Sequence, residues 1–236
     1  MNCKNNYNKL LTDHNFYEKN NKWIDPLEKN RLFNKFILFR NKSSTKFFLK
    51  NIFGIIYLTA IRKFNYFIIY NQDDNIIAKV NRLRFSNYFN IKLCNKSSKN
   101  DKNETILYGK RLKSIKCPSK YFIILPYKNL HLKYKNNLLK KLSNYPDYYI
   151  KKKNYNNKNI KLIINKIPNY NSKLKYYSLK FYNKNITVCS SKNYQLIYNN
   201  NIIFEFGKIS DDIFNILCKN PLSIIQAFGL ALVTFS

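Results

Sequence analysis

Short apolar or alternating segments recur along most of this chain and are separated by turn residues. They are Phe36–Phe39, Lys46–Leu49, Ile55–Ala60, Tyr66–Tyr70, Ile76–Val80, Phe89–Leu93, Thr105–Leu107, Tyr121–Leu125, Ile160–Ile164, Tyr176–Phe181, Tyr194–Tyr198 and Ile202–Phe206. Alternation with a period of two is typical of a strand that buries one face. Many short strands at this spacing predict a mainly β fold, a sandwich or a barrel, and closing the sheet into a barrel removes its exposed edges.

Two of these segments carry sharper expectations. In Tyr176–Phe181 every second residue is apolar (Tyr177, Leu179 and Phe181), which predicts a half-buried strand. Tyr121–Leu125 is apolar throughout, which predicts a central strand covered on both sides.

The last segment of the chain has the pattern of a helix with no polar face. From Leu222 to Phe235 the polar residues are only Ser223, Gln226 and Thr234. Asn220 can cap such a helix, and Pro221 suits its first turn. A helix that is apolar all round must be buried, and roughly 15 residues fall short of the about 20 needed to span a membrane. We therefore expect residues 221–235 to form a core helix inside the sheet.

The chain divides into a polar leader at residues 1–35 and one domain at residues 36–236. The opening stretch is polar and lacks the apolar run of a secretory signal. Residues 95–103 and 129–159 are rich in Asn, Lys and Ser and are predicted to be loops. The second of these holds Leu138, Leu139 and Leu142, which could form one short helix.

The chain is strongly basic, with a formal net charge of +31. Taken alone, this charge favours an anionic partner such as nucleic acid or an acidic membrane. However, the chain is rich in residues with A- and T-rich codons (Asn, Lys, Ile, Tyr and Phe) and poor in Asp, Glu, Gly and Ala. Codon bias alone would raise the Lys content, so only the positions of particular cations are informative.

The sequence shows no catalytic or metal-binding pattern. The motifs GxGxxG, GxxxxGK[ST] and HExxH are absent, and the chain has four glycines. Its cysteines are widely spaced, so we expect no disulfide framework, no metal site and no cofactor, with the thiols acting as small core residues in a reducing compartment. They are Cys3, Cys94, Cys117, Cys189 and Cys218. The pair Asp73 and Asp74 predicts a hairpin turn, and Asp211 with Asp212 predicts a structural role.

Several fragments occur in an order that resembles one protein family. Phe206–Phe214 reads FGKISDDIF, Asn220–Leu222 reads NPL and Gln226–Leu232 reads QAFGLAL. They are similar to FGRVAEDVF, NYPL and QAFAIAL in the C-terminal domain of tubby-like proteins. Further similar fragments are Tyr57–Lys63 (FLLAGRK), Arg82–Arg84 (KLR), Lys116–Lys120 (KGPRK), Asn165–Pro168 (NKTP) and Ser191–Leu196 (VKNFQI). The resemblance runs in order from about residue 36 to the end.

This resemblance implies a closed antiparallel barrel of about twelve strands around a central, buried C-terminal α-helix. It also implies lipid binding without catalytic activity: the family binds phosphoinositide headgroups, chiefly phosphatidylinositol 4,5-bisphosphate. Carried over by motif, the candidate phosphoinositide-binding residues are Arg62, Lys63 and Arg84, with Arg82 in place of the motif's lysine. Arginine suits this role because its planar fork donates paired hydrogen bonds to phosphate oxygens.

Two features of these residues sharpen the expectation. Arg82 and Arg84 are separated by one residue, so they would share one face of a strand about 7 Å apart. The family's basic run after the alanine is longer, whereas Phe64 interrupts it here after Lys63. Either the pocket is reduced or Phe64 inserts into the lipid surface. The alternative for Arg62 and Lys63 is a solvated turn in a lysine-rich chain.

The leading interpretation is a monomeric peripheral membrane tether or adaptor in the cytoplasm, at the inner face of the plasma membrane. Its partner would be a phosphoinositide-containing membrane, and the sequence does not identify a protein cargo. The alternative is a basic nucleic-acid-binding, transcription-related protein in the nucleus, which would bind with steep salt dependence and without preference among lipids. A scramblase-related protein is a third alternative, which would require lipid-insertion segments and often a metal.

Overall fold

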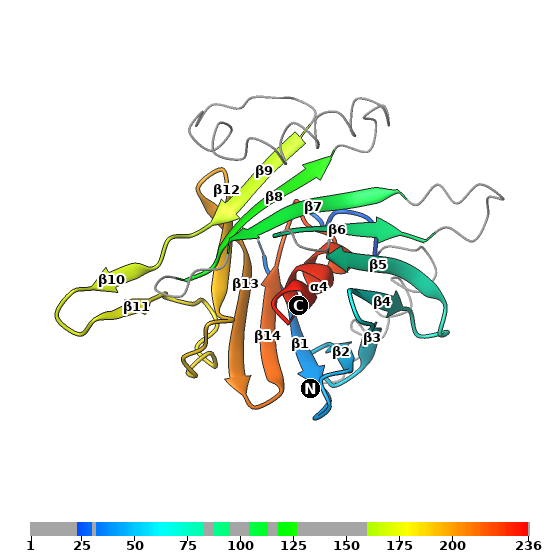
Figure 1. Cartoon of the computed structure of the whole chain (residues 1–236), viewed down its shortest axis with the longest axis horizontal. Helices are drawn as coiled ribbons and strands as arrows, with labels where there is room; N and C mark the ends of the chain where they lie inside the picture. The colour runs from blue at the N-terminus through cyan, green and yellow to red at the C-terminus, as the bar shows by residue number, and fades with distance from the viewer. Residues whose placement is uncertain are drawn as a thin grey trace, which may run out of the picture.

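The segments predicted as strands form a closed antiparallel barrel of twelve strands, which confirms the predicted fold class (Figure 1). The computed structural model describes residues 23–29, 32–82, 87–94, 104–112, 118–126 and 160–235. The barrel order is β1-β14-β13-β12-β9-β8-β7-β6-β5-β4-β3-β2, and a separate two-stranded sheet pairs β10 with β11.

The strand bounds agree with the alternating segments to within a few residues in most cases. The strands are β1 (Asn34–Arg40), β2 (Lys46–Lys50), β3 (Ile56–Arg62), β4 (Tyr66–Tyr70), β5 (Ile76–Arg82), β6 (Tyr88–Leu93), β7 (Thr105–Leu112), β8 (Lys120–Pro126), β9 (Ile160–Asn165), β10 (Asn169–Asn171), β11 (Tyr176–Ser178), β12 (Tyr194–Tyr198), β13 (Asn201–Ser210) and β14 (Ile213–Cys218). A turn at Asp73 and Asp74 joins β4 to β5, as predicted.

Neighbouring strands run in opposite directions, so the strand ends form two rims. Strands β1, β3, β5, β7, β9 and β13 end at one rim, where the other barrel strands begin. The C-terminal end of the helix α4 (Ile224–Val233) lies at this rim. There Phe235 packs on Phe47 of β2 and Phe214 of β14, with ring centroids 5.0 and 5.1 Å apart. We call this end of the barrel the Phe235 rim and the other end the opposite rim.

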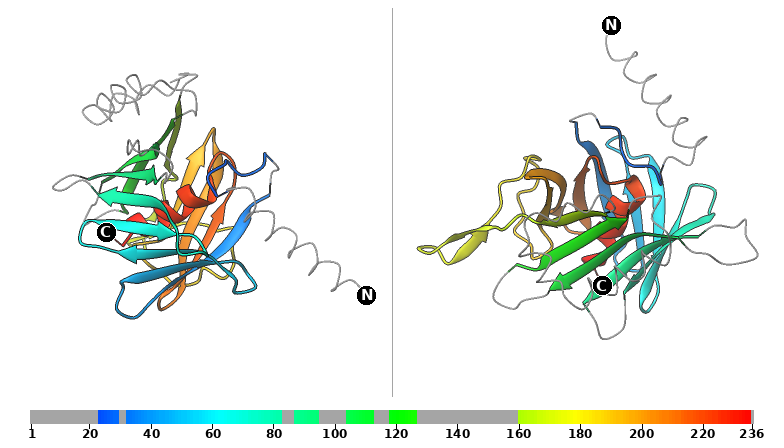
Figure 2. Two further views of the ribbon diagram at one scale, coloured as in Figure 1. Left: turned by 90° about the vertical axis from the view of Figure 1, so that its right-hand side faces the viewer. Right: turned by 90° about the horizontal axis from the view of Figure 1, so that it is seen from above.

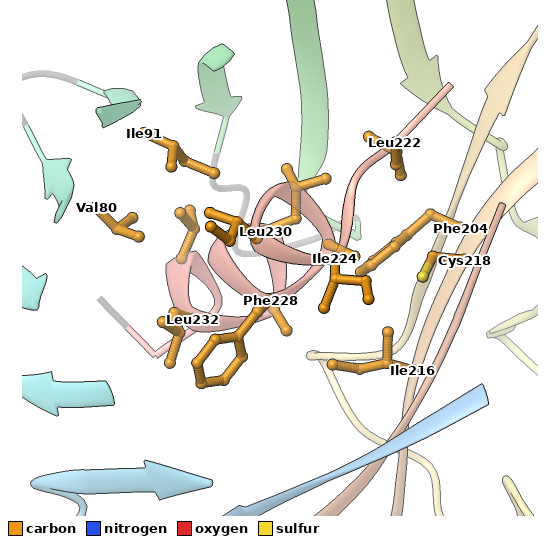
Figure 3. Packing of buried hydrophobic residues seen from close by; sticks show 14 of the residues in the cluster. Val80, Ile91, Phe204, Ile216, Cys218, Leu222, Ile224, Phe228, Leu230 and Leu232 are labelled. Atoms are coloured by element: carbon orange, nitrogen blue, oxygen red, sulfur yellow. The ribbon is translucent and has the colours of Figure 1, made fainter. Parts of the chain in front are cut away.

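The core lies between α4 and the inner faces of the strands. All ten residues of α4 are buried, as expected for a helix with no polar face. Val80 and Ile91 face the helix from one wall, and Phe204, Ile216 and Cys218 face it from another (Figure 3). The helix therefore fills the barrel in the way that a packed protein core requires.

The helix begins at a different cap from the one suggested by the sequence. Ser223 is the N-cap, and it forms a capping box with Gln226 in which each side chain bonds the other's backbone amide. The side chain of Asn220 is used elsewhere, because its Nδ2 donates to the Leu27 carbonyl at 2.8 Å. Residues 23–29 pack at this end of the helix, with Trp23 and Leu27 buried.

Three expectations about local structure require correction. The segment Tyr176–Phe181 is not a half-buried barrel strand, because β11 ends at Ser178 and lies exposed in the two-stranded sheet. The strand β8 is not covered on both sides, since its buried residues alternate with partly exposed ones. The strand β14 was not predicted, because its one polar residue, Asn215, is fully buried.

A segment that we call the outer strap, residues 179–193, covers the outer faces of β12, β13 and β14. Ile186 of the strap lies directly over Gly207, where a Cβ would approach its side chain to 2.6 Å. Beneath the strap, Glu205 accepts hydrogen bonds from the Tyr182 amide at 3.0 and 3.1 Å. Asn183 donates to Asn215 at 2.5 Å. Buried polar groups of the wall thus find partners in the strap.

Some sequence predictions lie outside the described residues. These include most of the leader, the loops at 95–103 and 129–159, the short helix around Leu138 and the residues Cys3, Cys117, His14 and His131. Of the described cysteines, which are all free thiols, Cys218 is buried, whereas Cys189 is exposed and does not serve as a core residue.

Candidate functional site

Arg62 and Arg82 lie at the Phe235 rim as the last residues of β3 and β5. Each continues the alternation that turns Ala60 or Val80 into the barrel, so both side chains start from the inner side of the rim. The strand β4 lies between them, and Phe67 pairs with both Arg62 and Val80. Ordinary strand spacing then gives a Cα separation of roughly 12 Å, which allows two long side chains to meet one ligand.

The β3–β4 turn brings a third cation and an apolar side chain to the same place. The Lys63 amide donates to the Tyr66 carbonyl at 2.8 Å, and the Arg82 amide donates to the Asn65 carbonyl at 3.1 Å. Between these two bonds, Phe64 is 91% exposed. The end of β5 is therefore joined directly to the turn that carries Lys63 and Phe64.

Three of the four predicted site residues thus come together: Arg62, Lys63 and Arg82 are exposed at one rim. Among the described residues, no carboxylate pairs with any of these three cations. Arg84 lies outside the described residues, so its position on the same face as Arg82 stays a prediction.

A pair of cations on the outer wall beside this rim was not singled out from the sequence. Lys79 of β5 pairs directly with Lys92 of β6, and both lie on the outer face between inward residues. Nearer the rim, Asn81 donates to Asn90 at 3.0 Å. Like charges that face each other across strands are destabilising, and a bound anion would relieve this repulsion. The alternation in β5 was the available signal, because it puts Lys79 and Asn81 on one face.

Inside the Phe235 rim, three more cations surround the end of α4. Arg111 Nη1 donates to the last carbonyls of the helix at 3.1 and 3.3 Å. The Arg40 Cζ and the Lys192 Nζ lie 5.4 and 5.9 Å from the centroid of the Phe235 ring. Cations near the carbonyl end of a helix favour its macrodipole, so these residues help to hold the core helix.

The charge inside the rim is only partly neutralised. Burial and neighbouring cations, Arg40 first among them, lower the pKa of Lys192. Asp212 accepts from Arg40 at 2.6 Å, and Asp211 accepts from Lys208 at 2.6 Å. The structural role predicted for these two carboxylates agrees with these ion pairs. The Phe235 rim is consequently electropositive on its inner side as well as at its edge.

The buried titratable groups serve packing in this fold. The Tyr121 and Tyr194 rings stack with centroids 4.4 Å apart, and the Tyr194 hydroxyl donates to the Leu230 carbonyl of α4 at 2.9 Å. Burial raises the pKa of Tyr121 to about 12 and that of Tyr194 well above its usual value. Both phenols therefore stay protonated and connect the barrel wall to the helix.

Two searches of the described part of the chain bear on other kinds of site. Within it, no group of three or more His, Cys, Asp or Glu side chains could hold a metal ion. None of its helices has the length and apolar character needed to cross a bilayer.

A closed antiparallel barrel with a buried C-terminal helix at its centre and a cationic rim defines a domain of the tubby type. Residues 64–236 match the model of the Tub family, and the chain belongs to that family.

Curated relatives carry tubby names. The chain is 39% identical to Tubby protein homolog 1 of Caenorhabditis elegans over 79 residues, which is 32% of this chain and 18% of the relative. It is 30% identical to Tubby-related protein 3 of Homo sapiens over 133 residues, which is 55% of this chain and 29% of the relative. The chain therefore spans less than a third of the length of these relatives, whose names denote no enzyme.

Proposed function

We propose that the protein is a peripheral membrane tether or adaptor that binds a phosphoinositide headgroup at the Phe235 rim. The observation that supports this proposal most strongly is the convergence of Arg62, Lys63 and Arg82 around the exposed ring of Phe64. A headgroup with several phosphates needs two or more cations held at fixed separation, and the barrel fixes the backbone that carries them. Arg84 belongs to the proposed site as the next outward cation after Arg82.

The same site suits the surface of an anionic membrane. A cation near such a surface contributes on the order of 1 kcal/mol, and the chain offers many lysines around the rim. Phe64 would enter the interface while the three cations hold phosphates. We accordingly propose that the protein acts at the cytoplasmic face of the plasma membrane, where the leaflet is anionic.

The test compares two double variants that remove equal charge. Arg62→Ala with Arg82→Ala alters the Phe235 rim, whereas Lys29→Ala with Lys35→Ala removes two exposed cations away from it, Lys35 lying near the start of β1 at the opposite rim. Vesicle sedimentation uses phosphatidylcholine with either phosphatidylinositol 4,5-bisphosphate or phosphatidylserine at matched charge.

The rim variant should lose about tenfold or more of its affinity for the phosphoinositide vesicles, because hydrogen bonds to charged groups are worth about 1.5–3 kcal/mol each. The control variant should lose little on either vesicle. Equal losses in the two variants would reduce the site to general charge. Tight binding to an RNA or DNA oligonucleotide without preference among lipids would favour a nucleic-acid-binding protein instead.

A further inference from the structure

The two-stranded sheet β10–β11 stands out from the barrel wall as a separate arm, which we define as residues 166–181 (Figures 1 and 2). Its three residue pairs are Asn169 with Ser178, Tyr170 with Tyr177, and Asn171 with Tyr176. The tip is shaped by the Asn171 side chain, which accepts from the Leu174 amide at 3.0 Å.

The arm exposes an unusual number of large apolar side chains. The tip residue Leu174 is 65% exposed, and Ile167 at the root is 81% exposed. Tyr170 and Tyr177 are 55% and 39% exposed and lie against each other with ring centroids 4.9 Å apart. Clustered apolar exposure on a projecting element marks an interaction surface.

The charge around these side chains has a single sign. Lys173 and Lys175 flank Leu174 at the tip, and Lys166 and Lys180 lie at the two ends of the arm. No acidic residue occurs between Ile160 and Phe204. A surface that combines leucine and tyrosine with lysine alone is complementary to an anionic bilayer, where tyrosine favours the headgroup level and lysine reaches phosphates.

Both roots of the arm are fixed to one residue of the barrel. The Lys166 amide donates to the Gln195 carbonyl at 2.9 Å, and the Gln195 side chain donates to the Lys180 carbonyl at 2.9 Å. The strand β9 ends at Asn165, so the arm leaves the barrel from the Phe235 rim, on which Arg62 and Arg82 also lie. A membrane that meets this rim can therefore meet the arm as well.

We propose that the arm is a second membrane contact, which inserts Leu174 and the Tyr170–Tyr177 pair into the interface of an anionic bilayer without selecting a headgroup. This inference rests on the proposed membrane function but uses a different surface. A single-stranded nucleic acid could also stack on tyrosines, but an exposed leucine at the very tip of the arm suits lipid better than bases.

The first experiment measures insertion directly. Leu174→Trp places a fluorophore at the tip, and the only natural tryptophan, Trp23, is 5% exposed and serves as an internal control. On phosphatidylcholine vesicles containing phosphatidylserine and no phosphoinositide, brominated lipids should quench the emission of the introduced indole and leave the emission of the parent protein unchanged. Absence of quenching on bound protein would overturn the proposal.

The second experiment measures affinity for the same vesicles. Leu174→Ser with Tyr170→Ser should weaken binding by roughly tenfold, given the apolar area withdrawn from the interface. Ile52→Ser with Phe53→Ser is the matched control, because these side chains are 53% and 49% exposed in the β2–β3 turn at the opposite rim. Thermal melting verifies that both variants fold.

The outcomes separate this proposal from the headgroup site. If the indole at the tip is quenched and the arm variant binds weakly, the arm contact stands even where no preference for phosphoinositide is found. If phosphoinositide binding depends on Arg62 and Arg82 while the arm variant binds phosphatidylserine vesicles as well as the parent does, the arm contact is wrong. An arm variant that loses affinity only for an RNA oligonucleotide would also overturn it.

Discussion

The backbone amide of Arg82 donates a hydrogen bond of 3.1 Å to the carbonyl of Asn65. Asn65 ends the turn that carries Lys63 and Phe64, so the main chain itself joins the end of β5 to this turn. A cation and an exposed aromatic ring are thus presented together by rigid elements. Fixed presentation matters for a multivalent headgroup, because paired hydrogen bonds to phosphate depend on geometry.

Replacing Phe64 with Ser should weaken binding to phosphoinositide vesicles about tenfold without lowering thermal stability. The ring is 91% exposed, so the folded protein loses no packing. Moving a Phe side chain from water into an apolar interface is worth about 1.5–3 kcal/mol. Vesicle sedimentation measures the affinity, with Phe53→Ser at the opposite rim as the control. Full affinity in Phe64→Ser would show that the ring remains in water.

Gly109→Ala should lower the free energy of unfolding by about 1–3 kcal/mol through overpacking. Gly109 lies directly across β6–β7 from Phe89, and a Cβ there would come within 2.0 Å of the Phe89 ring. Adding Phe89→Leu should recover part of the loss, because the smaller side chain vacates that space. Urea denaturation of the two single variants and the double variant gives the coupling, and simple additivity would contradict the clash.

Asp212 should respond differently to Asn and to Ala. Its carboxylate accepts from Arg40 at 2.6 Å, and its backbone has a positive φ of 62°. Asp212→Asn keeps an acceptor and a residue that tolerates this conformation, so we expect a loss of about 1 kcal/mol. Asp212→Ala should cost about 1 kcal/mol more, from backbone strain. Asp212→Gly separates the two effects in denaturation measurements, since it removes the acceptor but not the backbone freedom.

The barrel and its core helix could be predicted because their inner and outer faces differ in polarity. In β2, buried Phe47 and Leu49 alternate with more exposed neighbours, and that contrast is visible in sequence. Residues 176–181 have the same alternation, yet they form an exposed arm, because tyrosine suits water and a core equally well. The strand β14 lacks the contrast, since the outer strap buries its polar residue Asn215.

The candidate site was predictable in composition but not in arrangement. Arg62 and Lys63 follow from a motif, whereas their closeness to Arg82 depends on β4 pairing with both β3 and β5. Strand register of this kind is set by contacts between segments that no local pattern records. The opposition of Lys79 and Lys92 across β5 and β6 was missed for the same reason.

Glu205 should give the fold a pH dependence opposite to that of an ion-paired carboxylate. Burial raises the pKa of its carboxyl, and the hydrogen bonds from Tyr182 and Gln195 offset this effect only in part. The folded protein therefore holds the proton more tightly than the unfolded chain does. The contribution of Glu205 to stability is greatest at low pH and falls as the pH rises from the unfolded pKa through the folded one.

Chemical denaturation of the wild type and Glu205→Gln across about pH 4 to 7 tests this sign. The difference in free energy of unfolding, wild type minus variant, should decrease with rising pH and then level off. Asp211→Asn is the control, since a hydrogen bond from Lys208 lowers the pKa of the Asp211 carboxyl, and its difference should rise with pH instead. A rising difference at Glu205 would mean that its hydrogen bonds to the outer strap outweigh the cost of burying its charge.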